Sequence, residues 1–245
     1  MNPFRRPVLS VCVALGVVFL VSLGVWQLYR LSWKLDLIAQ TEARVSQSPV
    51  SLQTVPLSTT AEIDAARYRP VVLNGSFGAV PSVRVVGTLG GVSGYYVFST
   101  FTLSDPEAEP NAILVNRGFV SMDEATPNGL YGEEGEPVEL TGLVRTYETG
   151  GGLAGALAPP DDLTKGLFYQ RRKASFETYF DQDLPPVYID RLDHAGRADI
   201  PRGGTTRLDF NNRHFSYALT WFGLALTLIG VYIVMLRSNR KRQTD

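Results

Sequence analysis

Two long apolar stretches lie near the ends of the chain, at residues 7–29 and 215–236, and neither contains a charged residue. They are 23 and 22 residues long, and a helix needs about 20 apolar residues to cross the hydrocarbon of a bilayer. Each stretch therefore predicts a transmembrane helix. The rest of the chain is predicted to form two short tails, residues 1–6 and 237–245, and a body at residues 30–214.

Charge divides along the same boundaries. The body carries 17 Lys and Arg against 23 Asp and Glu, a net charge of −6, whereas the two tails together carry +5. Arg237, Arg240, Lys241 and Arg242 follow the second stretch directly, and basic residues mark the cytoplasmic flank of a span. We therefore predict that both termini are cytoplasmic and the body is periplasmic, in the inner (cell) membrane of a bacterium.

A cleaved signal peptide is the alternative reading of the first stretch, because Ser22 and Gly24 could form a small-residue cleavage site. The stretch continues past them to Trp26 and Tyr29, which are residue types that gather at membrane interfaces. This continuation favours a retained anchor.

An amphipathic helix is predicted to leave the membrane at residues 26–44, where Trp26, Trp33, Leu37 and Ile38 recur at helical spacing. The two tryptophans could form a face that binds a partner or stacks on a cofactor. Interfacial anchoring combined with core packing is the simpler explanation, and the sequence alone favours it.

Beyond Pro49 the chain consists of short runs rich in Val, Tyr, Phe and Thr, separated by Gly and Pro, which is the pattern of β-strands. No regular alternation of strand and helix appears. The body is therefore predicted to be a β-rich α+β domain of antiparallel strands, an arrangement compatible with a partial barrel. The predicted strands cover residues 68–77, 82–88, 95–103, 112–120, 138–147 and 186–190, with one helix at residues 172–182.

Composition excludes several functions. A net-acidic body with no basic stripe argues against nucleic-acid binding. The single cysteine, Cys12, cannot form a disulfide framework or a thiolate zinc site within one chain.

No enzyme motif is satisfied. The glycines of residues 87–94 (GTLGGVSG) fit neither a dinucleotide nor a phosphate loop, and a hairpin turn explains them better. The acidic pairs at residues 161–162 and 181–183 have no companion ligands at metal-binding spacing, and His194 reads as a loop residue. We expect a protein without catalytic activity.

One distinctive cluster stands at the start of the second apolar stretch. His214, Tyr217 and Trp221 are spaced i, i+3 and i+7, so they share a helix face that enters the membrane. A neutral imidazole at the edge of hydrocarbon could be an axial ligand of haem iron, with Arg213 placed for a propionate. An interfacial belt that only fixes helix depth is the alternative, and the residues alone favour that belt.

Five segments, in this order, resemble the surfeit locus protein 1 family, whose members are assembly factors of haem-copper cytochrome oxidase. The resemblance covers nearly the whole chain. The segments are residues 23–34 (LGVWQLYRLSWK), 68–77 (YRPVVLNGSF), 114–120 (LVNRGFV), 142–145 (GLVR) and 212–222 (NRHFSYALTWF). This chain departs from the family pattern at Asp161, Phe168 and Arg172, and at Phe119 of the third segment.

The resemblance implies a non-enzymatic chaperone of the respiratory chain that assists delivery of haem a to subunit I of cytochrome c oxidase. Subunit I and haem a synthase are the implied partners. The resemblance makes His214 the expected haem contact and reverses the preference for the interfacial belt at that residue. Tyr217, Trp221 and Arg213 are carried over more weakly, as neighbours. Arg117 is expected to be structural, tying strands together.

A different class of function stays open from the sequence. The protein could be a scaffold that stabilises an oxidase assembly intermediate without binding haem.

Overall fold

A computed structural model describes residues 5–105, 107, 111–126, 129–149, 158–193, 200–206 and 213–241. The chain divides into two compact units. One unit contains residues up to 41 and from 209 onward, and the other contains residues 42–208. His194, which the sequence places in a loop, lies outside the described residues.

Two long helices form the terminal unit. Helix α1 covers Arg5–Val45 and helix α5 covers His214–Lys241. Both are long and apolar enough to cross a membrane, at Pro7–Val45 and His214–Ser238. The prediction of an apolar helix near each end of the chain is confirmed, and insertion into a bilayer stays a prediction.

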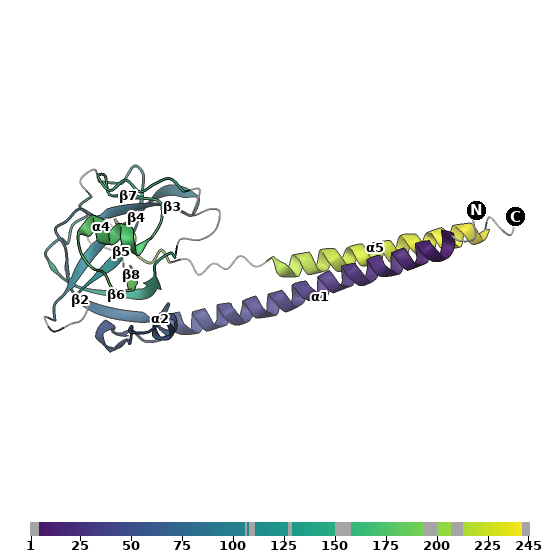
Figure 1. The fold of residues 1–245 in the computed structure, drawn as a ribbon, viewed down its shortest axis with the longest axis horizontal. Helices are drawn as coiled ribbons and strands as arrows, with labels where there is room; N and C mark the ends of the chain where they lie inside the picture. The colour runs from purple at the N-terminus through teal and green to yellow at the C-terminus, as the bar shows by residue number, and fades with distance from the viewer. Residues whose placement is uncertain are drawn as a thin grey trace. The chain divides into compact units, whose positions relative to one another are not determined.

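The two helices lie side by side and antiparallel (Figure 1). Gly24 faces Phe222, and Gly16, two turns earlier, faces Leu228. Nearer the chain ends, the hydroxyls of Ser10 and Tyr232 are 2.6 Å apart. Glycine at the contact positions lets two helices approach closely, which is the usual way in which helices pack in an apolar solvent.

The body is built on one eight-stranded sheet with the order β1-β2-β6-β8-β5-β4-β3-β7. Its strands are β1 (Val50–Ser51), β2 (Pro70–Phe77), β3 (Val83–Leu89), β4 (Val92–Leu103), β5 (Ala112–Ser121), β6 (Pro137–Thr146), β7 (Leu167–Phe168) and β8 (Val187–Arg191). The prediction of a sheet-rich body is confirmed, and each of its six predicted strands overlaps an observed one.

The sheet closes on itself. The end of β2 pairs with β4 as well as with β6, through the register Gly75↔Leu103 and Phe77↔Phe101. Strands β2, β6, β8, β5 and β4 therefore form a closed ring. Alternate residues of these strands point inward and make an apolar interior that includes Val71, Phe101 and Ile189.

The prediction of antiparallel strands is correct for most of the described strand pairs and wrong for three of them. Strand β5 pairs with β8 in parallel, and β1–β2 and β3–β7 are parallel as well. The chain between β5 and β8 contains β6, β7 and helix α4 (Lys173–Phe180), so it is long enough to return to the starting edge. Parallel neighbours need a crossover connection of this kind.

Helix α4, which the sequence predicts at residues 172–182, covers a second apolar cluster. Phe176 of α4 packs on Phe98 of β4 at 5.0 Å and on Phe168 of β7 at 5.3 Å between ring centroids. All three side chains are fully buried. Phe168, one of the departures from the family pattern, is thus a core residue.

Two shorter features also belong to the body. Helix α2 (Thr60–Ala66) begins at a capping box formed by Thr59 and Glu62, and it is followed in the chain by β2. The turn between β3 and β4 contains Gly90 and Gly91, both with positive φ. The predicted hairpin at residues 87–94 is therefore confirmed.

Candidate functional site

His214 is the first residue of α5 and meets α1 through its side chain. Its Nδ1 lies 2.8 Å from Oε1 of Gln27. Both side chains are half-buried. The residue that the family resemblance makes the expected haem contact is thus held by a hydrogen bond between the two apolar helices.

The buried positions of α5 define the face that contacts α1. Ala218 and Ala225 are almost completely buried, and His214 and Trp221 are half-buried. These positions recur at spacings of four, three and four, which form one stripe on a helix. Tyr217 is 52% exposed and therefore lies outside this stripe. Of the two aromatic residues, Trp221 therefore shares the helix face of His214 and Tyr217 does not.

Arg213 stands just before α5 and is exposed. Its carbonyl oxygen accepts a hydrogen bond from the backbone N–H of Tyr217 at 3.1 Å. This bond closes the first turn of the helix. The guanidinium is accessible at the point where the apolar helix begins.

Gln27 contacts His214 but was not predicted as a site residue, although it belongs to the segment at residues 23–34 on which the resemblance rests. A signal for it does exist, because Gln27 is the only carboxamide within the apolar stretch at residues 7–29. Polar side chains inside a span usually face another helix or serve a function. Only the pairing of the helices shows which residue Gln27 contacts.

The aromatic residues of α1 remain exposed. Trp26 is 57% exposed and Trp33 is 51% exposed. The guanidinium carbon of Arg30 lies 3.9 Å from the centre of the Trp33 ring, a cation–π contact. The exposure of both tryptophans contradicts the core packing expected of them, whereas their anchoring at a membrane interface stays a prediction.

A buried arginine pair lies in the body. Arg117 of β5 is completely buried, and its Nη1 donates to Glu134 Oε1 at 2.8 Å. Arg191 of β8 donates through Nη1 to Glu133 Oε2 at 2.7 Å. Phe77 lies beneath the Arg117 guanidinium, 4.2 Å away.

This arrangement explains the ionisation of Glu134. Burial alone would raise its pKa, but the backbone N–H of Tyr131 and the guanidinium of Arg117 hold the pKa below its ordinary value. The arginines therefore fasten the loop that carries Glu133 and Glu134 across one end of the strand ring. The expected structural role of Arg117 agrees with these contacts, although its partners are mainly carboxylates and not strand carbonyls.

A second polar cluster centres on Asp190, which is 5% exposed. Its carboxylate accepts hydrogen bonds from Asn116 at 2.8 Å, Arg145 at 2.9 Å and Thr206 at 2.8 Å. These partners join β5, β6 and a later segment to β8. These hydrogen bonds connect three separate segments to β8, so the cluster stabilises the fold.

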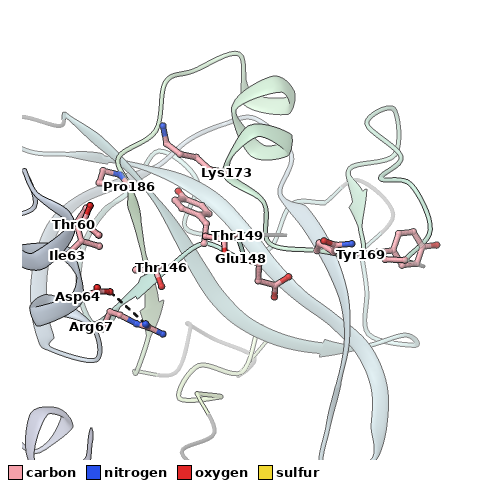
Figure 2. A pocket seen from close by; sticks show the side chains of 13 residues that line it. Thr60, Ile63, Asp64, Arg67, Thr146, Glu148, Thr149, Tyr169, Lys173 and Pro186 are labelled. Carbon is pink, nitrogen blue, oxygen red and sulfur yellow. Dashed lines mark ion pairs between the residues drawn. The ribbon is translucent and has the colours of Figure 1, made fainter. Parts of the chain in front are cut away.

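A cavity of about 980 Å³ in the body is an open groove (Figure 2). Thr60, Ile63, Asp64 and Arg67 of the α2 region line one side, and Glu148 and Tyr169 lie across from them. Asp64 and Arg67 form an exposed ion pair at 3.8 Å. The side chains that line the groove therefore carry both charge signs.

The acidic pair at residues 161–162 shapes a turn. Asp162 Oδ1 accepts from the Thr164 hydroxyl at 2.6 Å, and this bond together with Lys165 lowers the Asp162 pKa to about 2. Asp161 Oδ2 accepts from the Ser175 hydroxyl at 2.7 Å. Within the described part of the chain, no group of three or more His, Cys, Asp or Glu is placed to hold a metal ion.

Comparison with known proteins gives a family. A sequence model of the SURF1 family matches residues 14–226, which include Gln27 and His214. Surfeit locus protein 1 of Xenopus tropicalis is 34% identical over 220 residues, covering 83% of this chain and 67% of that protein. The human protein of the same name is 33% identical over 222 residues, covering 83% and 69%. The Drosophila melanogaster SURF1-like protein is 32% identical over 223 residues, with the same coverage. The chain belongs to the SURF1 family.

Proposed function

We propose that this protein is a membrane-anchored assembly factor of haem-copper cytochrome c oxidase, and that it assists the delivery or insertion of haem a into subunit I. Membership of the SURF1 family is consistent with a role in oxidase assembly. The proposed role is that of a chaperone and not of an enzyme.

The observation that carries the proposal is the placement of His214. His214 is the first residue of the apolar helix α5, and its Nδ1 lies 2.8 Å from Oε1 of Gln27. Histidines that bind metals commonly use one ring nitrogen for the metal and the other for an orienting hydrogen bond. The contact between His214 and Gln27 could serve as such an orienting hydrogen bond, which supports the proposal that the His214 ring contacts the iron.

The neighbouring residues suit the rest of a haem group. The apolar surfaces of α1 and α5 offer a medium into which a macrocycle partitions, and Trp221 adds an aromatic ring on the stripe of His214. The exposed Arg213 would pair with a propionate. When bound, haem a would supply the iron that accepts the imidazole, and the protein would supply orientation and charge neutralisation.

The proposed orientation places the body in the periplasm and both termini in the cytoplasm of a bacterial inner membrane. It is supported by the basic residues that follow the apolar stretch at residues 215–236, including Arg237 and Arg240. A cysteine at the exposed Asp123, in a Cys12→Ser background, would react with an impermeant maleimide added to spheroplasts. Protection of that cysteine until the membrane is broken would contradict the orientation.

The direct test compares two histidine variants. Full-length protein is co-expressed with the enzymes that make haem a and purified in detergent, and its absorption spectrum is recorded. His214→Ala should weaken or shift a low-spin haem spectrum, whereas the same substitution at His194, the only other histidine, should leave it unchanged. Identical spectra for the parent and His214→Ala would remove His214 from the ligand role.

The alternative is a scaffold that holds an oxidase assembly intermediate without haem. It is favoured by the ion pairs that buried Arg117 and Asp190 make with Glu134 and Arg145 inside the body. Co-purification of subunit I or haem a synthase that persists in His214→Ala, with no haem in any preparation, would support this alternative.

A further inference from the structure

We propose that a pocket at the β3–β7 end of the sheet binds a phosphate group. Arg84 of β3 and Lys165, which precedes β7, supply the positive charge, and Tyr179 of α4 lines the same pocket. The ligand would be free phosphate or the phosphate monoester of a larger molecule. The pocket belongs to the body, whereas the candidate haem site belongs to the terminal unit, so this inference does not depend on the function proposed above.

The charge of the pocket distinguishes it from the groove described above. The pocket has a volume of about 540 Å³. Among the described residues that line it, Arg84 and Lys165 carry positive charge and none carries a carboxylate. The groove in Figure 2 is lined by Asp64 and Glu148 as well as by Arg67. Because the body as a whole is acidic, a pocket with only cationic charges is a place where it attracts an anion.

Backbone pairing holds Arg84 beside Lys165. Strand β3 pairs in parallel with β7 through Arg84↔Leu167, and the backbone N–H of Arg84 donates to the carbonyl oxygen of Gly166 at 2.8 Å. Its side-chain Nη2 donates to the carbonyl oxygen of Lys165 at 3.2 Å. The guanidinium carbon lies 5.6 Å from the centre of the Tyr95 ring. The guanidinium is therefore positioned in the protein without ligand, which reduces the entropy lost on binding.

Arg84 and Tyr179 both have hydrogen-bond donors available for a ligand. A guanidinium presents several N–H groups in a fork that matches phosphate oxygens. Within the described part of the chain, the bond to Lys165 is the one hydrogen bond of the Arg84 side chain. The Tyr179 ring packs on Phe168 and Phe180, and its hydroxyl bonds to no described residue. Burial raises the pKa of Tyr179, so this hydroxyl stays protonated and can donate.

Lys165 can turn toward a ligand without disrupting the turn around it. Its Nζ lies 3.0 Å from Asp162 Oδ2, but its side chain is 73% exposed, and an exposed ion pair contributes little stability. Asp162 accepts three further hydrogen bonds, from the Thr164 hydroxyl and from the backbone N–H groups of Thr164 and Lys165. Asp162 therefore keeps its partners when the ammonium group moves.

Two cations and a hydroxyl match a phosphate better than a carboxylate. A phosphate monoester carries a charge of about −1.5 to −2 at pH 7 and has three acceptor oxygens, whereas a carboxylate carries a single charge. Arginine can hold two phosphate oxygens at once, and lysine acts as a point charge. Asp162 offsets part of the positive charge, so removing its charge should favour the ligand.

The test is a calorimetric titration of the full-length protein, in neutral detergent at constant ionic strength, with inorganic phosphate. Arg84→Gln and Lys165→Gln each remove one cation. Lys173→Gln is the matched control, because this lysine is paired with Glu177 and does not line the pocket. Asp162→Asn keeps an oxygen that can accept from Thr164 and removes the charge.

The parent should bind phosphate, and Arg84→Gln should weaken binding about 10-fold to 100-fold, because charge-assisted hydrogen bonds are lost. Lys165→Gln should weaken it by a smaller factor, and Lys173→Gln should leave it unchanged. Asp162→Asn should strengthen binding, which a loss of folding could not do. Equal affinities in the parent, Lys165→Gln and Asp162→Asn would overturn the proposal, even if Arg84→Gln fails to fold.

The source of the phosphate is decided by two further probes, glycerol phosphate and a short-chain phosphatidic acid dissolved in the same detergent. Tighter binding of phosphatidic acid would identify a lipid headgroup, and tighter binding of inorganic phosphate would identify the free ion. Either order supports the site if affinity falls in Arg84→Gln and Lys165→Gln. A parent that binds none of the three probes would overturn it.

Discussion

The ring of Phe222 in α5 packs against Gly24 in α1, where the absence of a glycine side chain leaves room for the ring. This contact sets the separation of the helices one turn away from the Gln27–His214 hydrogen bond. The geometry of the proposed site therefore depends on a residue that has no functional group.

A side chain at Gly24 should force the helices apart. Gly24→Leu inserts atoms where Phe222 lies, whereas Gly223→Leu adds the same atoms in open space on α5. Spin labels at the exposed Val21 and Leu224, in a Cys12→Ser background, report the separation by pulsed electron paramagnetic resonance. The distance should increase in Gly24→Leu and stay unchanged in Gly223→Leu. An equal distance in both variants would show that Gly24 does not set the spacing.

Arg117, which is completely buried in the body, should be essential for stability. Arg117→Met leaves Glu133 and Glu134 without the guanidinium that both contact. Removing one partner of a buried ion pair typically costs about 3–5 kcal/mol. Thermal unfolding of the full-length protein, followed by circular dichroism, measures the loss.

The control for Arg117 is a surface pair. Arg67→Met breaks an exposed ion pair with Asp64, which should cost about 1 kcal/mol or less. Equal effects of the two substitutions would contradict the structural role of Arg117.

Glu124 should titrate at unusually low pH. The Arg202 guanidinium, followed by the hydroxyl and backbone N–H of Ser121, lowers the Glu124 pKa from 4.5 to about 2. A carboxylate with a depressed pKa stabilises the fold at pH values above its unfolded pKa. Its contribution should therefore be complete above about pH 4.5 and be lost as the pH falls toward 2.

An NMR titration of the Glu124 carboxyl carbon checks this midpoint, and Arg202→Met should move it upward. A parent midpoint near 4.5 would show that the contact between Glu124 and Arg202 does not persist in solution.

Many of the helices and strands can be predicted from the local pattern of apolar and polar residues. Strand β5 at Ala112–Ser121 and helix α4 at Lys173–Phe180 lie where the sequence predicts them, because alternation and helical spacing act within a few residues. Helix α2 was missed despite its capping box at Thr59 and Glu62, since it has only seven residues. The parallel pairing of β5 with β8 has no local signature, because it depends on how a long connection returns.

The candidate site likewise contains one residue that has a local sequence signal and one that was not predicted. His214 is identifiable from its own segment, because a histidine at the start of an apolar stretch is unusual. Gln27 is 187 residues away from it. No spacing rule joins the two positions, and only the antiparallel packing of α1 and α5 brings them together.

The haem a content of the assembled oxidase tests the central claim most directly. The gene is deleted, and the activity and haem content of each terminal oxidase are measured separately. A haem a oxidase should lose both in the deletion strain, regain both with the parent gene or His194→Ala, and regain clearly less with His214→Ala. Unchanged activity and haem content in every oxidase of the deletion strain would contradict the proposed role in oxidase assembly.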